Sequence, residues 1–199
     1  IDGGFAMAAA HSDSPAFRLK EHPDRRSAHY VQLSTEKYGG MILSTWLDRP
    51  LSVAGRLAVK NGNGIEGRLV NIDRDLCVIP NVAIHMNREM NKGVEYNPQV
   101  DLLPLLADVS FDEYDAHTTY DAQTASENAE EQPEAVEKPT LVALAAETAG
   151  VDAETILGED LFLYTRQEGK MIGAKGEFVL SPRLDDLQCA FSSMEGFLQ

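Results

Sequence analysis

The segment Ala8-Ala-Ala-His-Ser-Asp-Ser-Pro15 ends a short apolar run at a histidine and an aspartate two positions apart. The run from Gly3 to Ala10 has the composition of a strand that is buried on both faces, as in a parallel sheet. Side chains two positions apart in an extended segment point the same way, so we expect His11 and Asp13 to face one pocket. At the carboxyl end of such a strand an imidazole can bind metal while a carboxylate orients its ring. A strand followed by a polar turn is the simpler alternative.

The middle of the chain has a different pattern, in which apolar and polar residues alternate. This alternation predicts half-buried antiparallel strands and a hairpin closed by the Asn-Gly cluster at 61–64. A shorter apolar run ends at Pro80, after which Asn81 is a candidate cap for a short helix through about Met90. The predicted strands are Phe17–Lys20, Tyr30–Leu33, Leu51–Val59, Ile65–Asn71, Leu76–Ile79 and a short one within Leu102–Val109.

The last third of the chain returns to a mixed pattern of helices and strands. Helices are predicted over Leu141–Thr148, from Asp152 to about Leu157, and over Leu184–Phe197. Strands are predicted over Leu161–Arg166 and Glu177–Leu180. The two ends therefore have the pattern of an α/β layer, whereas the middle has that of a separate β-rich module.

Length, composition and net charge limit the classes of protein to which the chain can belong. The chain has 199 residues, of which 43% are hydrophobic and 25% charged, as in ordinary globular proteins. Its net charge of -15 argues against nucleic acid as a partner, because phosphate binding needs clustered Lys and Arg. No apolar run approaches the roughly 20 residues that span a bilayer, and no basic leader is visible, although a chain without an initial methionine could have lost an upstream segment.

The acidic residues are concentrated between 111 and 138. This stretch carries nine Asp or Glu side chains and a single lysine, without an apolar period, and is predicted to be a flexible, solvated insertion. The two cysteines, Cys77 and Cys189, lie within apolar patterns and are expected to be buried, reduced thiols. A long-range disulfide would need an oxidising compartment, so a cytoplasmic location is expected.

Five blocks of sequence, in order, resemble the aspartyl aminopeptidase and vacuolar aminopeptidase I family of dinuclear zinc exopeptidases. The most specific carries Ser-Thr-Trp-x-Asp-Arg, which is nearly a signature of that family. The resemblance spans most of the chain apart from roughly 108 to 160. The blocks are Ala10–Lys20, Tyr38–Arg49, Leu51–Arg56, Ile79–His85 and Phe178–Asp185.

The resemblance implies a role for each candidate residue. His11 would be a terminal ligand of one zinc ion, and Asp185 would bridge the two ions of the complete site. Asp13 would orient the His11 imidazole, and His85 would reach across a subunit interface to help hold the substrate in the neighbouring active site. For Asp185 and Asp186 the alternative is a helix-end acid favoured by the helix dipole, and Asp186 fits that alternative better. Cobalt or manganese could replace zinc on such ligands.

The resemblance also implies the architecture. Residues 1–14 and 176–199 would be α/β metallopeptidase pieces, a strand with its metal loop and a strand with a helix. Residues 15–175 would be an inserted, β-rich α+β domain that makes homodimers, which assemble into a larger shell.

The expected activity is hydrolysis of peptides at their N-terminal residue, with Asp or Glu preferred. The sequence lacks the adjacent glutamates, the further aspartate and the final histidine that the family uses, and Glu130-Glu131 has no buried strand before it. The chain is therefore expected to be part of an enzyme and inactive alone, because two ligands cannot fix a dinuclear site. A non-catalytic oligomerisation module is the main alternative, and a β-domain that binds small molecules is a weaker one.

Overall fold

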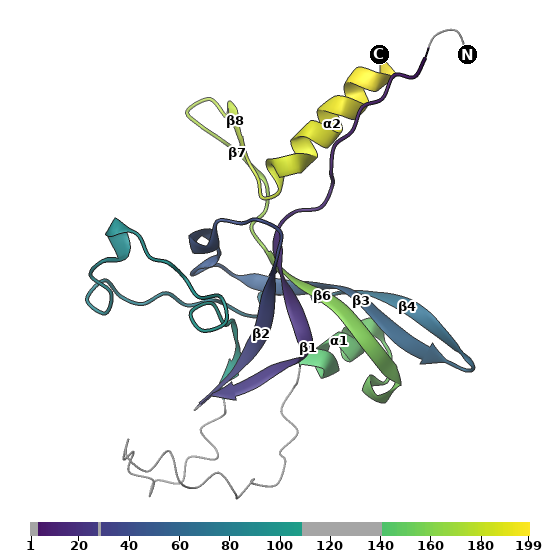
Figure 1. Cartoon of the computed structure of the whole chain (residues 1–199), viewed down its shortest axis with the longest axis vertical. Helices are drawn as coiled ribbons and strands as arrows, with labels where there is room; N and C mark the ends of the chain where they lie inside the picture. Colours follow the sequence, from purple (N-terminus) through teal and green to yellow (C-terminus); the bar gives the residue numbers. More distant parts are fainter. Residues whose placement is uncertain (1–3, 28, 109–140) are drawn as a thin grey trace, which may run out of the picture.

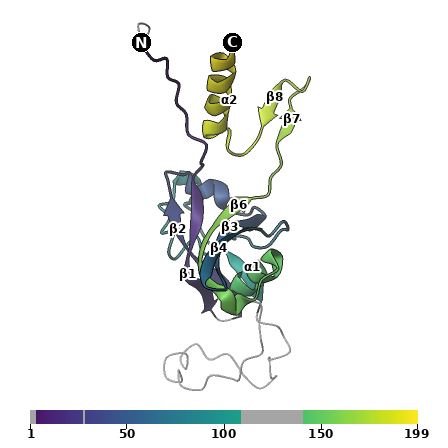
Figure 2. The same cartoon turned by 90° about the vertical axis from the view of Figure 1, so that its right-hand side faces the viewer.

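The structure, a computed structural model, describes residues 4–27, 29–108 and 141–199. Two regions are visible in Figure 1, a twisted sheet and a layer that projects from one end of it. We call the second region the terminal layer; it consists of the coil 4–15, the hairpin of β7 and β8, and helix α2. Figure 2 shows the coil, the helix and the hairpin on the same side of the sheet.

The sheet has six strands in the order β4-β3-β6-β1-β2-β5, and every neighbouring pair is antiparallel. Its centre is β6, which lies between β3 and β1 although more than 85 residues separate it from either. The strands are β1 (Ala16–Ser27), β2 (Tyr30–Tyr38), β3 (Leu51–Asn61), β4 (Gly64–Asn71), β5 (Leu105–Asp108) and β6 (Ile156–Thr165).

The alternating segments form the strands that the sequence predicts. In β1, Phe17 and Leu19 are buried while Arg18 between them is exposed, as expected for a sheet with one face on the core. The hairpin of β3 and β4 closes through residues 61–64, with Asn61 paired to Gly64. The segment 76–79 forms only isolated bridges, to Leu47, Leu51 and Leu105. The predicted strands and the hairpin are confirmed, and the strand predicted over residues 76–79 is confirmed in part.

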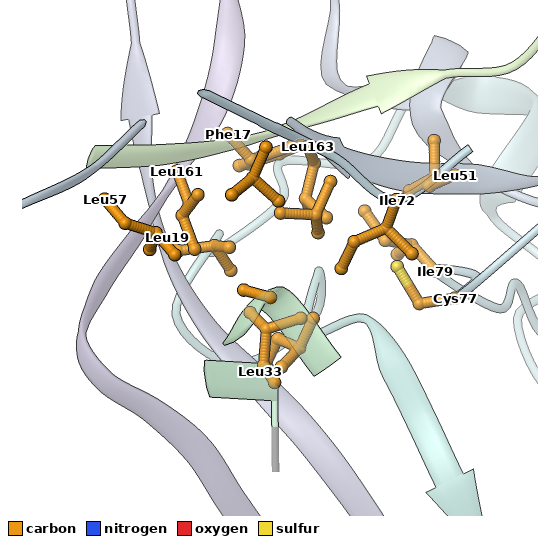
Figure 3. Close-up of a cluster of buried hydrophobic side chains, with 14 of the residues drawn as sticks. Phe17, Leu19, Leu33, Leu51, Leu57, Ile72, Cys77, Ile79, Leu161 and Leu163 are labelled. Carbon is orange, nitrogen blue, oxygen red and sulfur yellow. The ribbon is translucent and has the colours of Figure 1, made fainter. Parts of the chain in front are cut away.

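The core lies between the sheet and helix α1 (Leu141–Ala149). Fully buried leucines from several strands meet Leu141 and Ala145 there, and Figure 3 shows the side chains converging from both sides. The Asp24 carboxylate on β1 accepts the Leu141 N–H at 3.0 Å, which ties the first turn of α1 to the sheet. Trp46, in the 3-10 helix Leu43–Trp46, closes one end of the core with its ring against Phe17.

One glycine is required by the sheet itself. Gly55 on β3 faces β6 so closely that a Cβ atom there would lie 2.1 Å from the Asp160 carbonyl oxygen. Only a residue without a side chain permits this approach. The pairing of β3 with β6 therefore depends on Gly55.

The terminal layer contains β7 (Lys170–Ile172), β8 (Phe178–Leu180) and α2 (Leu184–Leu198). None of the residues of α2 is buried, and its apolar side chains face solvent together with those of the hairpin. The helix follows its prediction, but Asp185 and Asp186 depart from helical φ and ψ. Neither α1 nor α2 is long and apolar enough to cross a membrane, among the helices that the structure describes.

The strand predicted over residues 3–10 is wrong for the described part of it. Residues 4–15 form a coil, in which the side chains of Phe5 and Met7 are 82% and 90% exposed. A strand is stabilised by hydrogen bonds to a neighbour, and no described strand pairs with this segment. Apolar composition alone was therefore insufficient to predict a strand in this segment. The acidic segment 111–138 lies outside the described residues.

Three further predictions need correction. Asn81 does not begin an α-helix, because residues 84–86 form a turn and only Met90–Lys92 is a 3-10 helix. The apolar residues of this segment are exposed, so no packing stabilises a helix that is marginal alone. The helix predicted from Asp152 is the single 3-10 turn Ala153–Thr155, which Asp152 caps before β6 begins. Cys77 is buried, but Cys189 is exposed on α2.

Candidate metal centre

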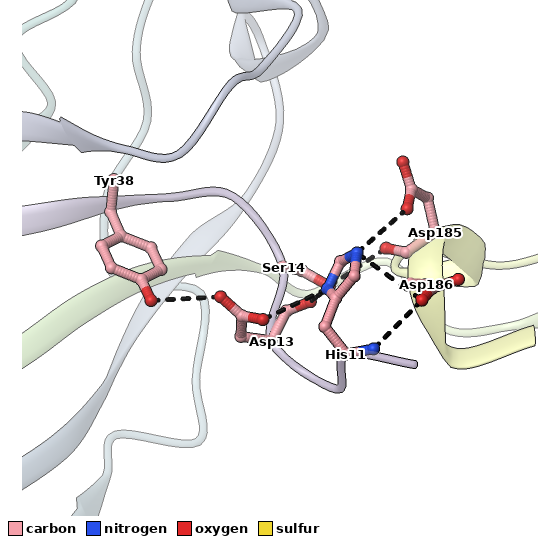
Figure 4. A network of polar contacts seen from close by, with 6 residues as sticks. All are labelled: His11, Asp13, Ser14, Tyr38, Asp185 and Asp186. Atoms are coloured by element: carbon pink, nitrogen blue, oxygen red, sulfur yellow. Dashed lines mark hydrogen bonds and ion pairs between the residues drawn. The ribbon is translucent and has the colours of Figure 1, made fainter. Parts of the chain in front are cut away.

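A histidine from the coil meets two carboxylates at the start of α2 (Figure 4). His11 Nε2 lies 3.8 Å from Asp185 Oδ1 and 3.6 Å from Asp186 Oδ2. The structure thus brings together His11 and Asp185, which the sequence placed in one site although they lie far apart in the chain. Among the described residues this is the one group of three His, Cys, Asp or Glu side chains whose ligand atoms lie within 4.8 Å of one another.

The other ring nitrogen of His11 faces Asp13. His11 Nδ1 lies 3.1 Å from the Asp13 carbonyl oxygen and 3.2 Å from Asp13 Oδ1, so both neighbours are hydrogen-bond acceptors. A proton on Nδ1 satisfies them and leaves the Nε2 lone pair facing the two carboxylates. The Asp13 backbone and side chain therefore favour the tautomer in which Nε2 can bind a cation.

Asp186 is the member of the cluster that sequence reasoning assigned to the helix dipole. Its carboxylate accepts the His11 backbone N–H at 3.2 Å and a hydrogen bond from the Cys189 thiol. Only 16% of its side chain is exposed, against 95% for Asp185. Asp186 thus has part of its acceptor capacity occupied, whereas the Asp185 carboxylate is open. The resemblance had set Asp185 apart as the ligand, but nothing in the sequence predicted that Asp186 contacts His11.

The titratable groups of the cluster influence one another. The pKa of His11 is raised, chiefly by its hydrogen bond to the Asp13 backbone, with the Asp186 charge also contributing. The pKa of Asp13 is lowered, most of all by the Tyr38 hydroxyl that donates to it, and the pKa of Tyr38 is raised in return. Hydrogen bonding to Cys189 lowers the pKa of Asp186. The lowered pKa values favour the charged forms of the Asp13 and Asp186 carboxylates.

The donor set fits a zinc ion. One imidazole nitrogen and carboxylate oxygens are ordinary zinc ligands, and bonds of about 2.0–2.2 Å place neighbouring ligand atoms roughly 3.3 Å apart in a tetrahedron. The separations of 3.6 and 3.8 Å need only a small inward movement. The described residues offer at most three donors, so coordination positions on a zinc ion held there would stay open.

A groove of about 890 Å³ runs from this cluster to the end of the sheet. Asp13 and Asp185 lie at its boundary on the metal side, and Arg49 and Arg183 bring positive charge to its lining. The remaining lining is largely aromatic and aliphatic, and includes Tyr38, Met41, Trp46 and Phe162. A groove of this size beside the candidate metal centre can accept part of a peptide.

His85 is not in this cluster. It is exposed in the turn 84–86, on the teal segment that loops out from the sheet in Figure 1. Its predicted role in a neighbouring subunit stays a prediction.

Comparison with known proteins gives consistent matches over the whole chain. Residues 1–199 match the family described as Aminopeptidase I zinc metalloprotease (M18). A probable M18 family aminopeptidase 2 from Clostridium novyi is 41% identical over 100% of this chain, which spans 41% of that relative's length.

Two solved structures share the fold. The complex of Ape4 and Nbr1 superposes with a TM-score of 0.74 at 32% identity, over 93% of this chain and 34% of the other. The mApe1 dodecamer of S. cerevisiae has a TM-score of 0.65 at 24% identity, over 94% of this chain and 37% of the other, and shows similarity of fold alone.

Proposed function

Because this chain belongs to the M18 family of aminopeptidase I zinc metalloproteases, we propose that it is part of a metallo-aminopeptidase that removes N-terminal residues, acidic ones in particular, from peptides. The observation that carries the proposal is the meeting of His11 Nε2 with the carboxylates of Asp185 and Asp186. A preference for Asp or Glu is supported by the two arginines in the adjoining groove, which is otherwise largely apolar.

His11 and Asp185 are the proposed zinc ligands, and Asp13 is the residue that orients the imidazole. Asp185 is assigned to the bridging position because its carboxylate is open, while that of Asp186 is engaged by His11 and Cys189. Zinc bound there supplies polarisation of the scissile carbonyl and a water of lowered pKa. The chain's own residues hold the imidazole in one tautomer and leave the groove open for the peptide.

We propose that the metal centre of the 199-residue chain is too poor in ligands for catalysis. The cluster offers three donors from the described residues, and a dinuclear site needs more, including a general base. Zinc should therefore bind weakly, and cobalt or manganese should bind on the same ligands. The chain spans about two fifths of the length of the relative from C. novyi.

Zinc titration of the whole chain by calorimetry tests the proposal. The unchanged chain should bind zinc weakly, and His11→Ala should abolish binding, because Nε2 is the nitrogen ligand. His22→Asn, at an exposed histidine of β1 outside the cluster, is the matched control and should bind as the unchanged chain does. Equal binding by His11→Ala would overturn the metal site. Turnover of a peptide with N-terminal Asp or Glu, or tight stoichiometric zinc, would overturn the expected inactivity.

We also propose the domain arrangement and assembly that the resemblance implies. The coil 4–14, β8 and α2 would be pieces of an α/β catalytic domain, and the sheet would be an inserted dimerisation domain whose dimers build a larger shell. In that assembly His85 would enter the active site of a neighbour. The exposure of Val82, Ile84 and Met86 around His85 supports an interface at this segment.

A purely structural oligomerisation module remains the second candidate, favoured by the exposed apolar side chains of the terminal layer. Mass measurement in solution with and without zinc separates the two, because a module of that kind should dimerise regardless of metal and of His11→Ala. A cytoplasmic location is proposed as well. It is supported by Cys77 and Cys189, which are both free thiols.

A further inference from the structure

A tyrosine of the sheet reaches the candidate metal centre. The hydroxyl of Tyr38, the last residue of β2, donates to Asp13 Oδ2 at 3.1 Å. The other carboxylate oxygen of Asp13 lies 3.2 Å from His11 Nδ1. Figure 4 shows these three side chains in a row that continues through His11 Nε2 to Asp185 and Asp186. Nothing in the sequence patterns had given Tyr38 a role.

We propose that Tyr38 is a positioning residue for the metal histidine and acts through Asp13. This inference rests on the proposed zinc site at His11 and deepens it. Tyr38 itself touches no proposed ligand. Its contribution is to fix the Asp13 carboxylate, which in turn fixes the ring plane and the tautomer of His11.

A residue that positions Asp13 is needed because His11 and Asp13 lie on a coil. Residues 4–15 have no ladder of backbone hydrogen bonds, and the side chains of His11 and Asp13 are both more than half exposed. The Nδ1 side of the His11 ring contacts the Asp13 carbonyl oxygen and the Asp13 carboxylate, and that carboxylate is itself free to rotate. A second hydrogen bond to that carboxylate removes the rotation, and the Tyr38 hydroxyl provides it.

Tyr38 is suited to this task because the sheet holds it at two places. Its backbone pairs with Ala16 at the start of β1, three residues after Asp13. Its ring packs edge-on against Phe162 of β6, with the centroids 5.5 Å apart. The hydroxyl thus has a position defined by the most stable part of the chain, and it transmits that position to the coil.

The test removes a single oxygen atom. Tyr38→Phe keeps the ring and its contact with Phe162 but loses the hydrogen bond to Asp13. Loss of a partner that orients a metal histidine costs about 10- to 100-fold in metal affinity, and Tyr38→Phe leaves Asp13 in place. We therefore expect zinc to bind the whole chain up to about 10-fold more weakly, at the lower end of that range. Tyr164→Phe is the matched control, since its hydroxyl donates to Asn71 Oδ1 at 2.7 Å, away from His11. Its zinc affinity should equal that of the unchanged chain.

A second readout separates positioning from general stability. In nitrogen-15 NMR spectra of the metal-free chain, His11 should carry its proton mainly on Nδ1, and Tyr38→Phe should shift the population toward the Nε2 tautomer. If Tyr38 acts through Asp13, Tyr38→Phe should have no further effect on zinc affinity in a chain that already carries Asp13→Ala.

The outcomes are distinguishable from failure of the proposed function. If His11→Ala binds zinc unchanged, the metal site itself is wrong. If His11→Ala loses zinc while Tyr38→Phe keeps both its zinc affinity and its tautomer ratio, only the role of Tyr38 is overturned. A further loss caused by Tyr38→Phe in the Asp13→Ala chain would overturn the action through Asp13.

Discussion

The sheet and the terminal layer both carry many apolar side chains, yet among the described residues the sheet buries them and the terminal layer exposes most of its own. Phe17, Leu57 and Leu163 on three strands are fully buried, whereas the apolar residues of α2 all remain at least partly exposed. The candidate metal centre lies in the layer that has no core of its own. The hydrophobic core and the candidate metal centre therefore lie in different parts of this chain. These parts are connected where the coil runs into β1 and where residues 166–169 lead from β6 to β7.

Within the terminal layer, polar contacts hold the coil to α2. The His11 backbone N–H donates to Asp186, and the Ser14 hydroxyl donates to the Asp185 carbonyl oxygen at 3.3 Å. Exposed hydrogen bonds of this kind contribute about 0.5–1.5 kcal/mol each to stability, far less than burial of a leucine side chain. We therefore expect the sheet to withstand conditions that release the terminal layer.

The largest contrast should come from truncating one apolar side chain in each region. Leu57→Ala removes a fully buried side chain from the centre of the sheet and should lower the free energy of unfolding by about 2–5 kcal/mol. Phe191→Ala on α2, where the side chain is 67% exposed, should change it by less than about 0.5 kcal/mol. Urea unfolding followed by circular dichroism measures both. Comparable losses would mean that α2 has a core that these contacts do not reveal.

A smaller effect is expected where β3 and β6 approach each other. Gly55→Ala should cost about 1–3 kcal/mol, because the added methyl group would collide with the Asp160 carbonyl oxygen and force the strands apart. Gly158→Ala, on β6 of the same strand pair, meets no atom within 4 Å and provides the control. The same unfolding assay applies, and an equal loss in Gly158→Ala would contradict the explanation by close contact.

The smallest effect concerns the tie between the sheet and α1. Asp24→Ala should lose about 1 kcal/mol because the Leu141 N–H loses its acceptor, while Asp24→Asn keeps one. Partial burial raises the pKa of Asp24 in the folded chain. The resulting stability is complete below the ordinary Asp pKa and is lost as the pH rises through the raised value. Unfolding measured from pH 3 to pH 7 should show this slope in the unchanged chain and a weaker slope in Asp24→Asn.

Local patterns were sufficient for most of the sheet and for β8 and α2, but insufficient for the coil of the terminal layer. Alternation predicts β1, β2, β3 and β4 because each strand has one buried and one exposed face. The run of residues 4–10 looks equally regular, but a strand also requires a partner, which composition does not reveal. The helix predicted after Asn81 failed for a related reason, because its apolar side chains find no surface to cover.

The residues of the candidate site were likewise only partly predictable from the sequence. His11 and Asp185 were identified through motifs, and the structure brings them together. Asp186 and Tyr38 could not be identified, because their contacts with His11 and Asp13 depend on how α2 and β2 are placed against the coil. A residue that positions another side chain leaves no pattern of its own in a single sequence.

The pairing of Phe17 with Leu163 brings the beginning and the end of the sheet side by side. His11 and Asp186 are 175 residues apart, and closing so long a loop costs about 4–5 kcal/mol in chain entropy, whereas the short connections left once β1 and β6 are paired cost roughly 3 kcal/mol. During folding, zinc should consequently be captured only after these two strands have paired. The rate of zinc uptake would then report when β1 and β6 have paired.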